Sequence, residues 1–435
     1  MYIQKIDITN IRSIDRLEWS IDAGKEAGWH VIIGDNGSGK STLLRAIALA
    51  LVGPLEAAAL RQDWNTWLTQ ESTDGSVYLE VVADKTVDKF SGSGKAPKSN
   101  LFPIGITIQR QFDTTKIEKK SEVSQDPDRY VWGNSAGWFS ASFGPFRRFT
   151  GGDKEYERIF SANPKLAAHL SVFGENIALT ECIVWLQQLW TKKLEIQFKQ
   201  PEKQPLRTLL DDIIDFVNQE DFLPHTTKIK EVSSEGVWFI DGNDNTIAVE
   251  ELSDGYRSIL SMSFEIIRQI ARIYGEKSIF APGDPSKIIP PGVILIDEVD
   301  AHLHPTWQRT IGPWFRKHFP NMQFIVTTHS PFICQAATDG SVYRLPKPGS
   351  YETGRMITGI ELDRLLYGNV LDAYGTNVFG SNIARSEESM RKLQRLADLN
   401  LKELNGQLTP KESAEQDRLR SILPTTAHQT RNPSQ

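Results

Sequence analysis

The residues best suited to chemistry lie in a glycine-rich stretch near the N-terminus. Residues 31–42 read V-I-I-G-D-N-G-S-G-K-S-T, an apolar run and a glycine-rich turn that lead into a helix-forming segment. The spacing of Gly34, Gly39, Lys40 and Ser41 satisfies G-x-x-x-x-G-K-[ST], whose glycines let successive backbone N–H groups surround phosphate oxygens. The residues predicted to bind phosphate are Asn36, Gly37, Ser38, Gly39, Lys40, Ser41 and Thr42.

Two side chains of this loop have separate predicted roles. Lys40 would reach the β- and γ-phosphates of a nucleotide, and Ser41 would hold Mg²⁺. The positive end of the following helix would face the anion. A chance glycine turn is the alternative, and the strand before it and the helix after it argue against that interpretation.

Two adjacent carboxylates follow a second apolar strand. Residues 292–296 read G-V-I-L-I, and Asp297 and Glu298 come directly afterwards. Such a run predicts a strand buried in a parallel sheet, which delivers both acids to the edge that carries the phosphate loop. We predict that Asp297 binds Mg²⁺ through water and that Glu298 orients and polarises an attacking water. A structural pair of surface acids is the alternative, but adjacent carboxylates at the end of a buried strand are costly without a cation.

A histidine and the start of a helix are two further candidates for contacts with phosphate. His329 follows the predicted buried strand 323–328 and stands in the same relation to the site as Asp297, so we predict that it senses the γ-phosphate. Ser253 and Asp254 are N-cap types ahead of a long apolar helix, and Gly255 keeps the turn open, which leaves N–H groups free for an anion. A plain helix cap explains this turn equally well by itself.

Other polar residues have competing interpretations. His302 and His304 suggest zinc, but no further ligands follow at suitable spacing. Arg147 and Arg148, in the turn G-P-F-R-R-F, suit a phosphate, a neighbouring subunit or a surface salt bridge. The lysines of a polar insert at about residues 84–128 could contact nucleic acid, although interspersed acids favour a solvated loop. These lysines are Lys89, Lys95, Lys98, Lys116, Lys119 and Lys120.

The composition is that of an ordinary globular protein. The chain has 435 residues, 39% hydrophobic and 24% charged, and its 49 basic and 55 acidic residues give a net charge of -6, which excludes a nucleic-acid coat. Cys182 and Cys334 show no metal or redox spacing. The first ten residues alternate like a strand rather than a signal peptide, and the apolar run 46–60 is interrupted at Gly53 and Pro54. We therefore expect a cytoplasmic protein without a membrane partner.

The surrounding pattern predicts an α/β fold in four parts. Alternating residues at 2–9 and 11–21 predict an opening β-sheet, and residues 342–345 predict a last strand. Residues 387–404, together with a capping box at 409–412, predict an αα-hairpin. We expect a frayed end at 425–435. The predicted parts are a nucleotide-binding lobe with the polar insert at 1–150, a helical lobe with short strands at 151–250, a lobe at 251–345 and a C-terminal helical tail at 346–435.

Four strings occur in a fixed order along the chain. They are G-D-N-G-S-G-K-S-T, L-S-D-G-Y-R, V-I-L-I-D-E-V-D-A-H-L-H-P and F-I-V-T-T-H-S-P. Together they resemble the ABC-type ATPases of the RecF, SMC and OLD group, over residues 1 to about 345. The resemblance implies a P-loop ATPase head with a mixed central sheet, an antiparallel β subdomain and a helical lobe, here followed by the αα-hairpin.

The resemblance also implies how such a head would work. Members of the group dimerise head to tail, so that ATP lies between the phosphate loop of one subunit and the signature helix of the other. Ser253 and Gly255, with Asp254 between them, would then face the γ-phosphate across the interface. The segment Asn10–Ser13, which contains Arg12, would flank the adenine.

Further roles follow from the same resemblance. Asp300 and Ala301 would form the loop that links the two sites, and His329 would be the switch histidine. The signature reads L-S-D-G rather than L-S-G-G, which disfavours a transporter motor. The glutamine of the usual Q-loop is not identified: the candidates are Gln62, Gln109 and Gln111, or the G-P-F-R-R turn in their place.

Within the group the chain looks most like the stand-alone ATPases of bacterial anti-phage systems, in particular the Septu type. That resemblance implies a homodimer or higher homo-oligomer that regulates a separate effector such as an HNH nuclease. The alternative is a RecF- or SMC-like clamp that binds DNA during repair.

Overall fold

The computed structural model describes residues 1–60, 62–92, 99–112, 114–121, 125–133, 135–149, 163–174, 179–199, 206–350, 352–369 and 386–423. The chain divides into two compact units, Met1–Gly368 and Asn369–Gln435, which are described separately. Lys95, Lys98 and the predicted frayed end at 425–435 lie outside the described residues. The predicted four-part domain division stays a prediction.

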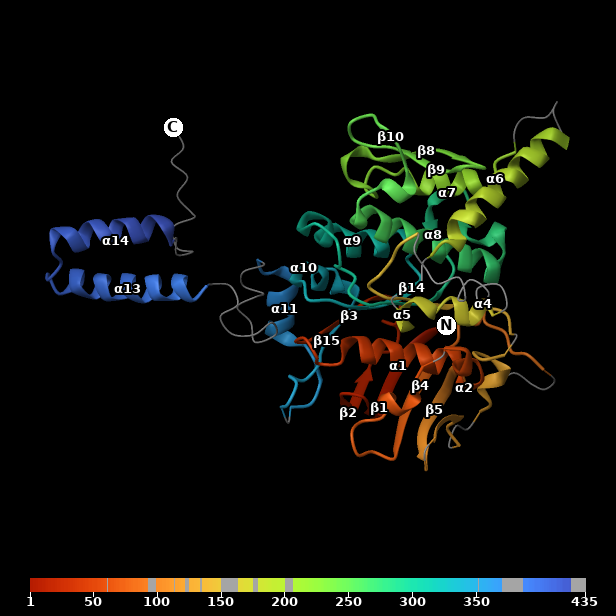
Figure 1. The fold of residues 1–435 in the computed structure, drawn as a ribbon, viewed down its shortest axis with the longest axis horizontal. Coiled ribbons are helices and arrows are strands. Elements are labelled where there is room, and N and C mark those ends of the chain that lie inside the picture. The colour runs from red at the N-terminus through yellow and green to blue at the C-terminus, as the bar shows by residue number, and fades with distance from the viewer. Residues whose placement is uncertain are drawn as a thin grey trace. The chain divides into compact units, whose positions relative to one another are not determined.

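A six-stranded mixed sheet forms the centre of the first unit (Figure 1). Its order is β16-β15-β3-β14-β13-β7, and every neighbouring pair is parallel except β15 and β16. The predicted strand at 342–345 is therefore not the last, because β16 pairs with the end of β15. The bounds are β3 Gly28–Ile33, β7 Ser140–Phe143, β13 Gly292–Ile296, β14 Met322–Thr327, β15 Gly340–Arg344 and β16 Arg355–Met356.

A second, antiparallel sheet is formed mainly by the N-terminal residues. Its order is β2-β1-β4-β5-β6. We expected the polar insert to be a solvated loop, and this is wrong for β5, because Ile104, Ile106 and Ile108 are buried in the core. Residues of β6 remain largely exposed. The bounds are β1 Tyr2–Ile11, β2 Ile14–Ser20, β4 Asp74–Val82, β5 Leu101–Gln111 and β6 Thr114–Lys119.

Helix α1, Lys40–Val52, packs between the two sheets (Figure 1). Its residues from Leu43 to Val52 are buried except Arg45, so they fill one core together with side chains of both sheets, such as Ile106 and Leu295. The long helices α8, Asp254–Tyr274, and α9, Pro305–His318, lie on the other face of the central sheet. Covering both faces explains why β13 and β14 are buried along their whole length.

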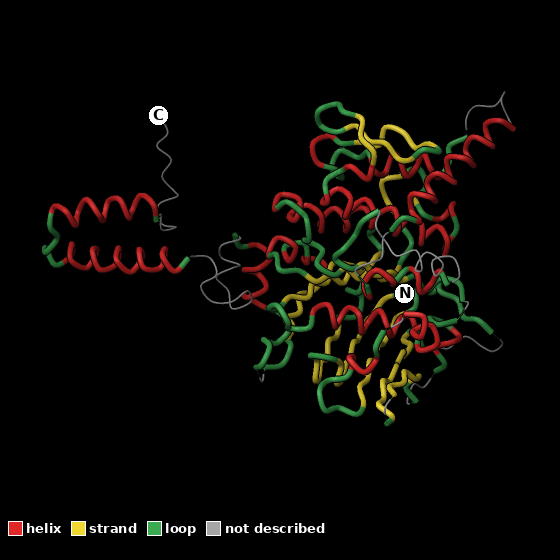
Figure 2. Tube along the Cα trace, viewed as in Figure 1, coloured by secondary structure: helices red, strands yellow, loops and turns green. Residues whose placement is uncertain are grey.

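The other elements of the first unit are short except for α6 (Figure 2). The three-stranded sheet has the order β10-β9-β8. The helices are α2 Pro54–Ala57, α4 Pro164–Ala167, α5 Leu170–Phe173, α6 Glu181–Lys199, α7 Leu209–Val217, α10 Pro331–Cys334 and α11 Gly359–Tyr367. The strands are β8 Lys228–Ser233, β9 Gly236–Ile240, β10 Thr246–Ala248, β11 Phe280–Ala281 and β12 Asp284–Ile288.

The second unit contains the predicted αα-hairpin. Its helices are α13, Glu387–Leu404, and α14, Pro410–Ile422. Leu396 and Leu399 of α13 pack with Leu419 of α14 and with Leu423. The predicted capping box at Thr409 and Glu412 is present, with Pro410 at the first helical position.

Within the described residues, no single helix is long and apolar enough to cross a membrane. One sharply bent pair, Lys40–Val52 with Pro54–Leu60, meets the length and composition criteria together. Its first member, α1, is a core helix, which explains its apolar composition.

Candidate functional site

The predicted phosphate loop lies between β3 and α1. Its two glycines are required by geometry, because a Cβ on Gly34 would lie 2.5 Å from the Ser38 hydroxyl oxygen, and Gly39 has a φ of +97°. Gly39 also lies against the turn between β1 and β2, where a Cβ would meet the Ser13 hydroxyl oxygen at 2.8 Å. The loop is therefore held open between the sheet edge and the N-terminal turn.

The loop presents donors without partners. In the described part of the chain, the backbone N–H groups at 37 and at 39–42 donate no hydrogen bond, and no side chain caps α1. The Ser38 hydroxyl is buried and likewise has no partner. Buried polar groups are normally satisfied, so this set fits an anion with several acceptor oxygens. The residues therefore suit a nucleotide phosphate, with the Ser41 hydroxyl available for Mg²⁺.

The Lys40 side chain is buried and folds back over the loop. Its Nζ donates hydrogen bonds to the carbonyls of Gly34 at 2.9 Å and Asp35 at 3.0 Å. Burial lowers the pKa of Lys40, and the carboxylates of Asp297 and Glu298 oppose that shift. The ammonium thus lies within electrostatic range of both predicted carboxylates.

The two acidic residues follow β13 and both bond to a threonine on the next strand, Asp297 through its carboxylate and Glu298 through its backbone. Asp297 is 1% exposed, and its Oδ1 accepts a hydrogen bond of 2.6 Å from the Thr327 hydroxyl. The same hydroxyl accepts the Glu298 backbone N–H at 2.8 Å. Thr327 is fully buried, so one side chain fixes the positions of both consecutive acids.

Glu298 has an unusual backbone. Its φ is +47°, in the left-handed region that non-glycine residues seldom occupy. The Val299 N–H bonds to the Thr327 carbonyl at 3.1 Å and the Ala301 N–H bonds to the Glu298 carbonyl at 2.9 Å, which maintain this turn. Strain of this kind persists only when the surroundings determine it, and it concentrates at functional sites.

Arg147 differs from its prediction. We expected it to face a phosphate, a neighbouring subunit or a surface salt bridge, but it is 4% exposed and bonds inside the protein. Its guanidinium donates to the backbone carbonyls of Asp297 at 2.8 Å and Glu298 at 3.0 Å, and to the Ser258 hydroxyl at 2.8 Å. Burial lowers the pKa of Arg147 to about 10, so it stays cationic at neutral pH.

His329 follows β14 and is exposed. Burial of part of the ring lowers its pKa, and the positive charge of Lys40 lowers it further. Because β3, β13 and β14 are parallel, their carboxyl ends place Lys40, Glu298 and His329 at one edge of the sheet. This arrangement agrees with the predicted site.

The start of α8 is not joined to this edge. Ser253 and Asp254 are exposed, the Ser253 side chain makes no capping bond, and no hydrogen bond or ion pair within the described residues links them to the phosphate loop. Helices α1 and α8 lie on opposite faces of the central sheet (Figure 1). Gly255 instead packs against the loop after Glu298, where a Cβ would lie 2.9 Å from the His302 carbonyl oxygen.

Arg12 lies in the turn between β1 and β2. Its guanidinium carbon is 4.6 Å from the ring centroid of Trp67, and its φ is +50°. Burial and the positive charge of Arg45 lower its pKa. The turn touches the phosphate loop through Ser13, whereas the predicted contact of Arg12 with adenine stays a prediction.

The predicted linking loop is ordered by the strand beside it. The Asp300 carboxylate accepts a hydrogen bond from the Thr328 hydroxyl. His304 caps α9 and bonds to Thr306, and no group of three metal-ligating side chains occurs among the described residues. The Q-loop stays unassigned, since Gln109 and Gln111 are exposed on β5 and Gln62 bonds to the carbonyls at 60 and 173.

Sequence reasoning missed three residues that shape the site, namely Arg147 in its buried role, Ser258 and Thr327. The signal for Thr327 was available, because a threonine pair ends an otherwise apolar strand next to His329. For Arg147 and Ser258 there was no local signal, since 111 residues separate them in the chain.

Two family models match separate parts of the chain. Residues 3–59 match the "P-loop containing region of AAA domain". Residues 190–335 match the model described as "AAA domain, putative AbiEii toxin, Type IV TA system". The first contains the phosphate loop and the second contains the signature, the paired carboxylates and His329.

Curated relatives include defence proteins. The Septu protein PtuA of Bacillus mycoides (strain KBAB4) is 26% identical over 344 residues, 78% of this chain and 40% of its own length. The "Retron Ec83 probable ATPase" of Escherichia coli is 32% identical over 138 residues, 32% of this chain and 24% of its own length. The "Retron Vc95 probable ATPase" of Vibrio cholerae serotype O1 biovar El Tor is 22% identical over 400 residues, 78% of this chain and 72% of its own. The chain thus spans less than half of the first two relatives.

Among solved structures, an Smc head bound to the C-winged helix domain of ScpA has a TM-score of 0.46 at 16% identity, over 82% of this chain and 97% of that chain. A score of this size carries no argument about function. The order of the motifs, the geometry at the sheet edge and these matches together support an SMC- or RecF-like P-loop ATPase, similar to the Septu and retron ATPases of anti-phage systems.

Proposed function

We propose that this chain binds and hydrolyses ATP with Mg²⁺, and that two copies close head to tail around the nucleotide. The observation that carries the proposal is the meeting of unpartnered phosphate-loop donors with the Asp297–Glu298 pair at one sheet edge, while no hydrogen bond or ion pair among the described residues links Ser253 or Asp254 to the phosphate loop. One subunit therefore supplies only part of a site, which a second subunit would complete.

In this proposal each residue has one role in phosphoryl transfer. Lys40 and the loop N–H groups stabilise charge on the β- and γ-phosphate oxygens. Glu298 orients water, whose oxygen attacks the γ-phosphorus as the bond to the bridging oxygen breaks. The bridging oxygen keeps the electron pair and ADP leaves, while Glu298 accepts the proton. Ser41 and Asp297 would hold Mg²⁺, which when bound neutralises phosphate charge.

The remaining contacts position the γ-phosphate. His329 donates to it, and Ser253, Asp254 and Gly255 of a second copy approach with the free N–H groups of α8. Only ATP carries the γ-phosphate that forms this contact, so ATP and ADP favour different assemblies. The positions of Arg12 beside adenine and of Asp300 and Ala301 between the two sites belong to the same proposal.

Glu298→Gln tests this mechanism. We expect at least a hundredfold slower ATP turnover, since general-base catalysis contributes about 10²–10⁴-fold. We also expect an ATP-dependent dimer by sedimentation velocity with ATP and Mg²⁺. Glu235→Gln is the matched control, because Glu235 is exposed in the turn between β8 and β9. Unchanged turnover in Glu298→Gln would contradict the proposed role of Glu298. Nucleotide bound by a monomer at all concentrations would contradict a site shared by two subunits.

The biological role we propose is a cytoplasmic switch in anti-phage defence that regulates a separate effector, such as an HNH nuclease. Support comes from the Septu and retron relatives. The test is to co-express the chain with the product of the adjacent reading frame and to measure ATP-dependent co-purification and nuclease activity. A clamp acting in DNA repair predicts instead ATP-dependent, salt-sensitive retention of duplex DNA by this chain alone.

A further inference from the structure

A cavity lies at the opposite edge of the central sheet from the phosphate loop. It has a volume of about 310 Å³, at the small end of the range for ligand pockets. Ser140, the first residue of β7, lines it, whereas the phosphate loop follows the carboxyl end of a parallel strand. Arg272 and Ile273, in the last turn of α8, line it as well, some twenty residues from the signature at the other end of that helix.

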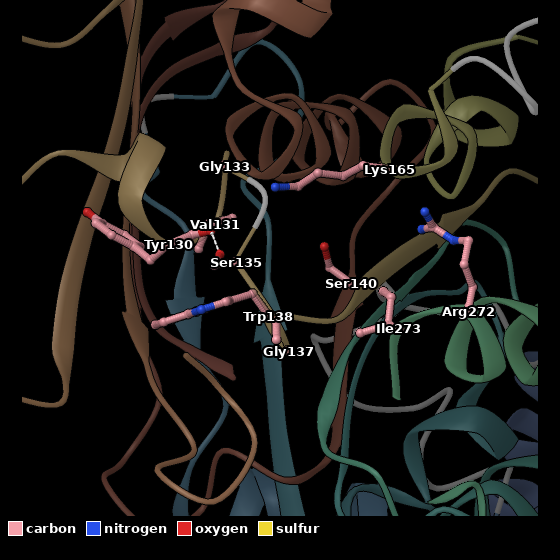
Figure 3. Close-up of a pocket in the computed structure, with 11 residues that line it drawn as sticks. Tyr130, Val131, Gly133, Ser135, Gly137, Trp138, Ser140, Lys165, Arg272 and Ile273 are labelled. Atoms are coloured by element: carbon pink, nitrogen blue, oxygen red, sulfur yellow. Dashed lines mark hydrogen bonds between the residues drawn. The ribbon is translucent and has the colours of Figure 1, made fainter. Parts of the chain in front are cut away.

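Among the described residues, the charged side chains that line this cavity are all cationic. They are Lys165 of α4 and Arg272 of α8. Figure 3 shows the Lys165 side chain reaching across the pocket toward the segment with Gly133, and the Ser140 hydroxyl and Arg272 guanidinium pointing up from the other side. The Ser140 hydroxyl is held in place by His169 Nε2 at 3.0 Å.

Lys165 is the unusual member of this pair. It forms no hydrogen bond or ion pair with any described residue, and burial together with the charge of Arg272 lowers its pKa to about 8. Glu56 and Asp128 oppose that shift, but neither lies within ion-pair distance. Arg272 is better compensated, because it donates to Gln269 and the helix C-terminus attracts cations. An ammonium partly removed from water without a partner is destabilising, so a bound anion would relieve it.

The backbone around the cavity adds further donors. The N–H groups of Gly133, Ser135, Ala136 and Gly137 donate no hydrogen bond to the described part of the chain. Two cations with several N–H and O–H donors match a doubly charged anion with three or more oxygens better than a carboxylate with one charge. The cavity thus offers the complement of a phosphate group.

We propose that this pocket, between β7, α4 and the end of α8, is a second anion site that binds a phosphate group, either inorganic phosphate or the phosphate of a mononucleotide. Lys165 and Arg272 supply the charge and Ser140 a hydrogen bond. The site is independent of the proposed ATPase chemistry, because it shares no residue with the phosphate loop.

The experiment uses the full chain carrying Lys40→Ala, so that the phosphate loop does not contribute. Inorganic phosphate and AMP are titrated separately by calorimetry, with acetate at equal ionic strength as the carboxylate comparison. Saturable binding of inorganic phosphate would show that the free ion is sufficient to fill the site. Binding of AMP without binding of inorganic phosphate would show that the site takes the phosphate group of a mononucleotide. Equal binding of acetate, or no saturable binding of phosphate and AMP, would overturn the proposal.

Three further substitutions in this background locate the binding. Lys165→Met should weaken binding by about tenfold or more, since it removes a charged hydrogen-bond donor. Lys165→Arg should largely restore it, and Lys116→Met, at an exposed lysine of β6, should not change it. Affinity should fall above about pH 8 as Lys165, which faces Arg272, Glu56 and Asp128, loses its proton. Equal affinity in Lys165→Met and Lys116→Met would overturn the proposal.

A stability measurement separates ligand binding from a structural role. Without phosphate, Lys165→Met should melt at the same temperature as the parent or higher, because it removes an unpaired charge. Adding phosphate should then raise the melting temperature of the parent but not that of Lys165→Met. A lower melting temperature of Lys165→Met without phosphate would assign Lys165 a structural role and would contradict the site.

Discussion

The guanidinium of Arg147 joins the signature helix to the carboxylate strand by donating from Nε to the Ser258 hydroxyl oxygen at 2.8 Å. Its other nitrogens bind the backbone carbonyls of Gly144, Asp297 and Glu298. We therefore expect a displacement of Glu298 to be coupled to the second turn of α8 through Arg147. A nucleotide bound beside Glu298 would then also affect the start of α8.

Removing one end of that contact should destabilise the protein. Ser258→Ala leaves the Arg147 Nε–H without a partner in a buried place, and we expect a loss of about 1–3 kcal/mol in the free energy of unfolding. Arg147→Met leaves three buried carbonyls short of a donor, and we expect a larger loss of about 3–5 kcal/mol. Urea denaturation measures both. Arg16→Met, at an exposed arginine of β2, is the control, and an equal loss there would contradict the argument.

Thr327→Val tests how the two carboxylates are aligned. Valine keeps the shape of threonine but removes the hydroxyl shared by Asp297 and the Glu298 N–H. We expect unfolding to be easier by about 1–3 kcal/mol. The Mg²⁺ concentration for half-maximal ATP turnover should also rise, because Asp297 is no longer oriented. An unchanged Mg²⁺ dependence alongside reduced stability would restrict Thr327 to a structural role.

Gly255→Ala tests the contact between the signature and the loop after Glu298. A Cβ at this position would lie 2.9 Å from the His302 carbonyl oxygen, closer than real Cβ contacts allow, so the backbone must move. Overpacking of this kind typically costs about 1–3 kcal/mol. ATP-dependent dimerisation should weaken more than nucleotide binding by the isolated subunit, measured by sedimentation and by fluorescence titration. Normal dimerisation would contradict a role for Gly255 at the interface.

Buried His169 should make stability depend on pH. Burial lowers its pKa from 6.5 to about 3, with the charge of Lys165 as a smaller cause. Below pH 6.5 the unfolded chain therefore binds a proton that the folded chain does not, so stability falls as pH decreases. The contribution is about 1.4 kcal/mol per pH unit in this window.

His169→Gln should remove that part of the pH dependence. The comparison is the slope of the unfolding free energy against pH below 6.5, from urea denaturation of both proteins. His304→Gln, at an exposed histidine, is the control and should keep the slope of the parent. Parallel slopes for all three proteins would show that His169 is not the titrating group.

Much of the fold could be predicted because its signals are local. The apolar runs before Gly34, Asp297 and His329 predict strands, and the structure confirms all three. The capping box at Thr409 predicts the start of α14, because it too is a local pattern. Predictions were weaker where composition was polar, as in β5, whose buried isoleucines pair with β4 despite the polar residues on both sides.

The sequence by itself determined the chemistry of this protein: which loop can surround a phosphate, which carboxylates can act on it, and in what order the motifs follow. These depend on residue types at short, fixed spacing, which the backbone translates directly into geometry. Only the tertiary structure decided that Arg147 is buried between two motifs, that Thr327 bonds both the Asp297 carboxylate and the Glu298 backbone, and that Lys165 and Arg272 line one cavity. Such pairings join residues far apart in the chain, and no local pattern encodes them, because packing and desolvation depend on every element that surrounds the side chain.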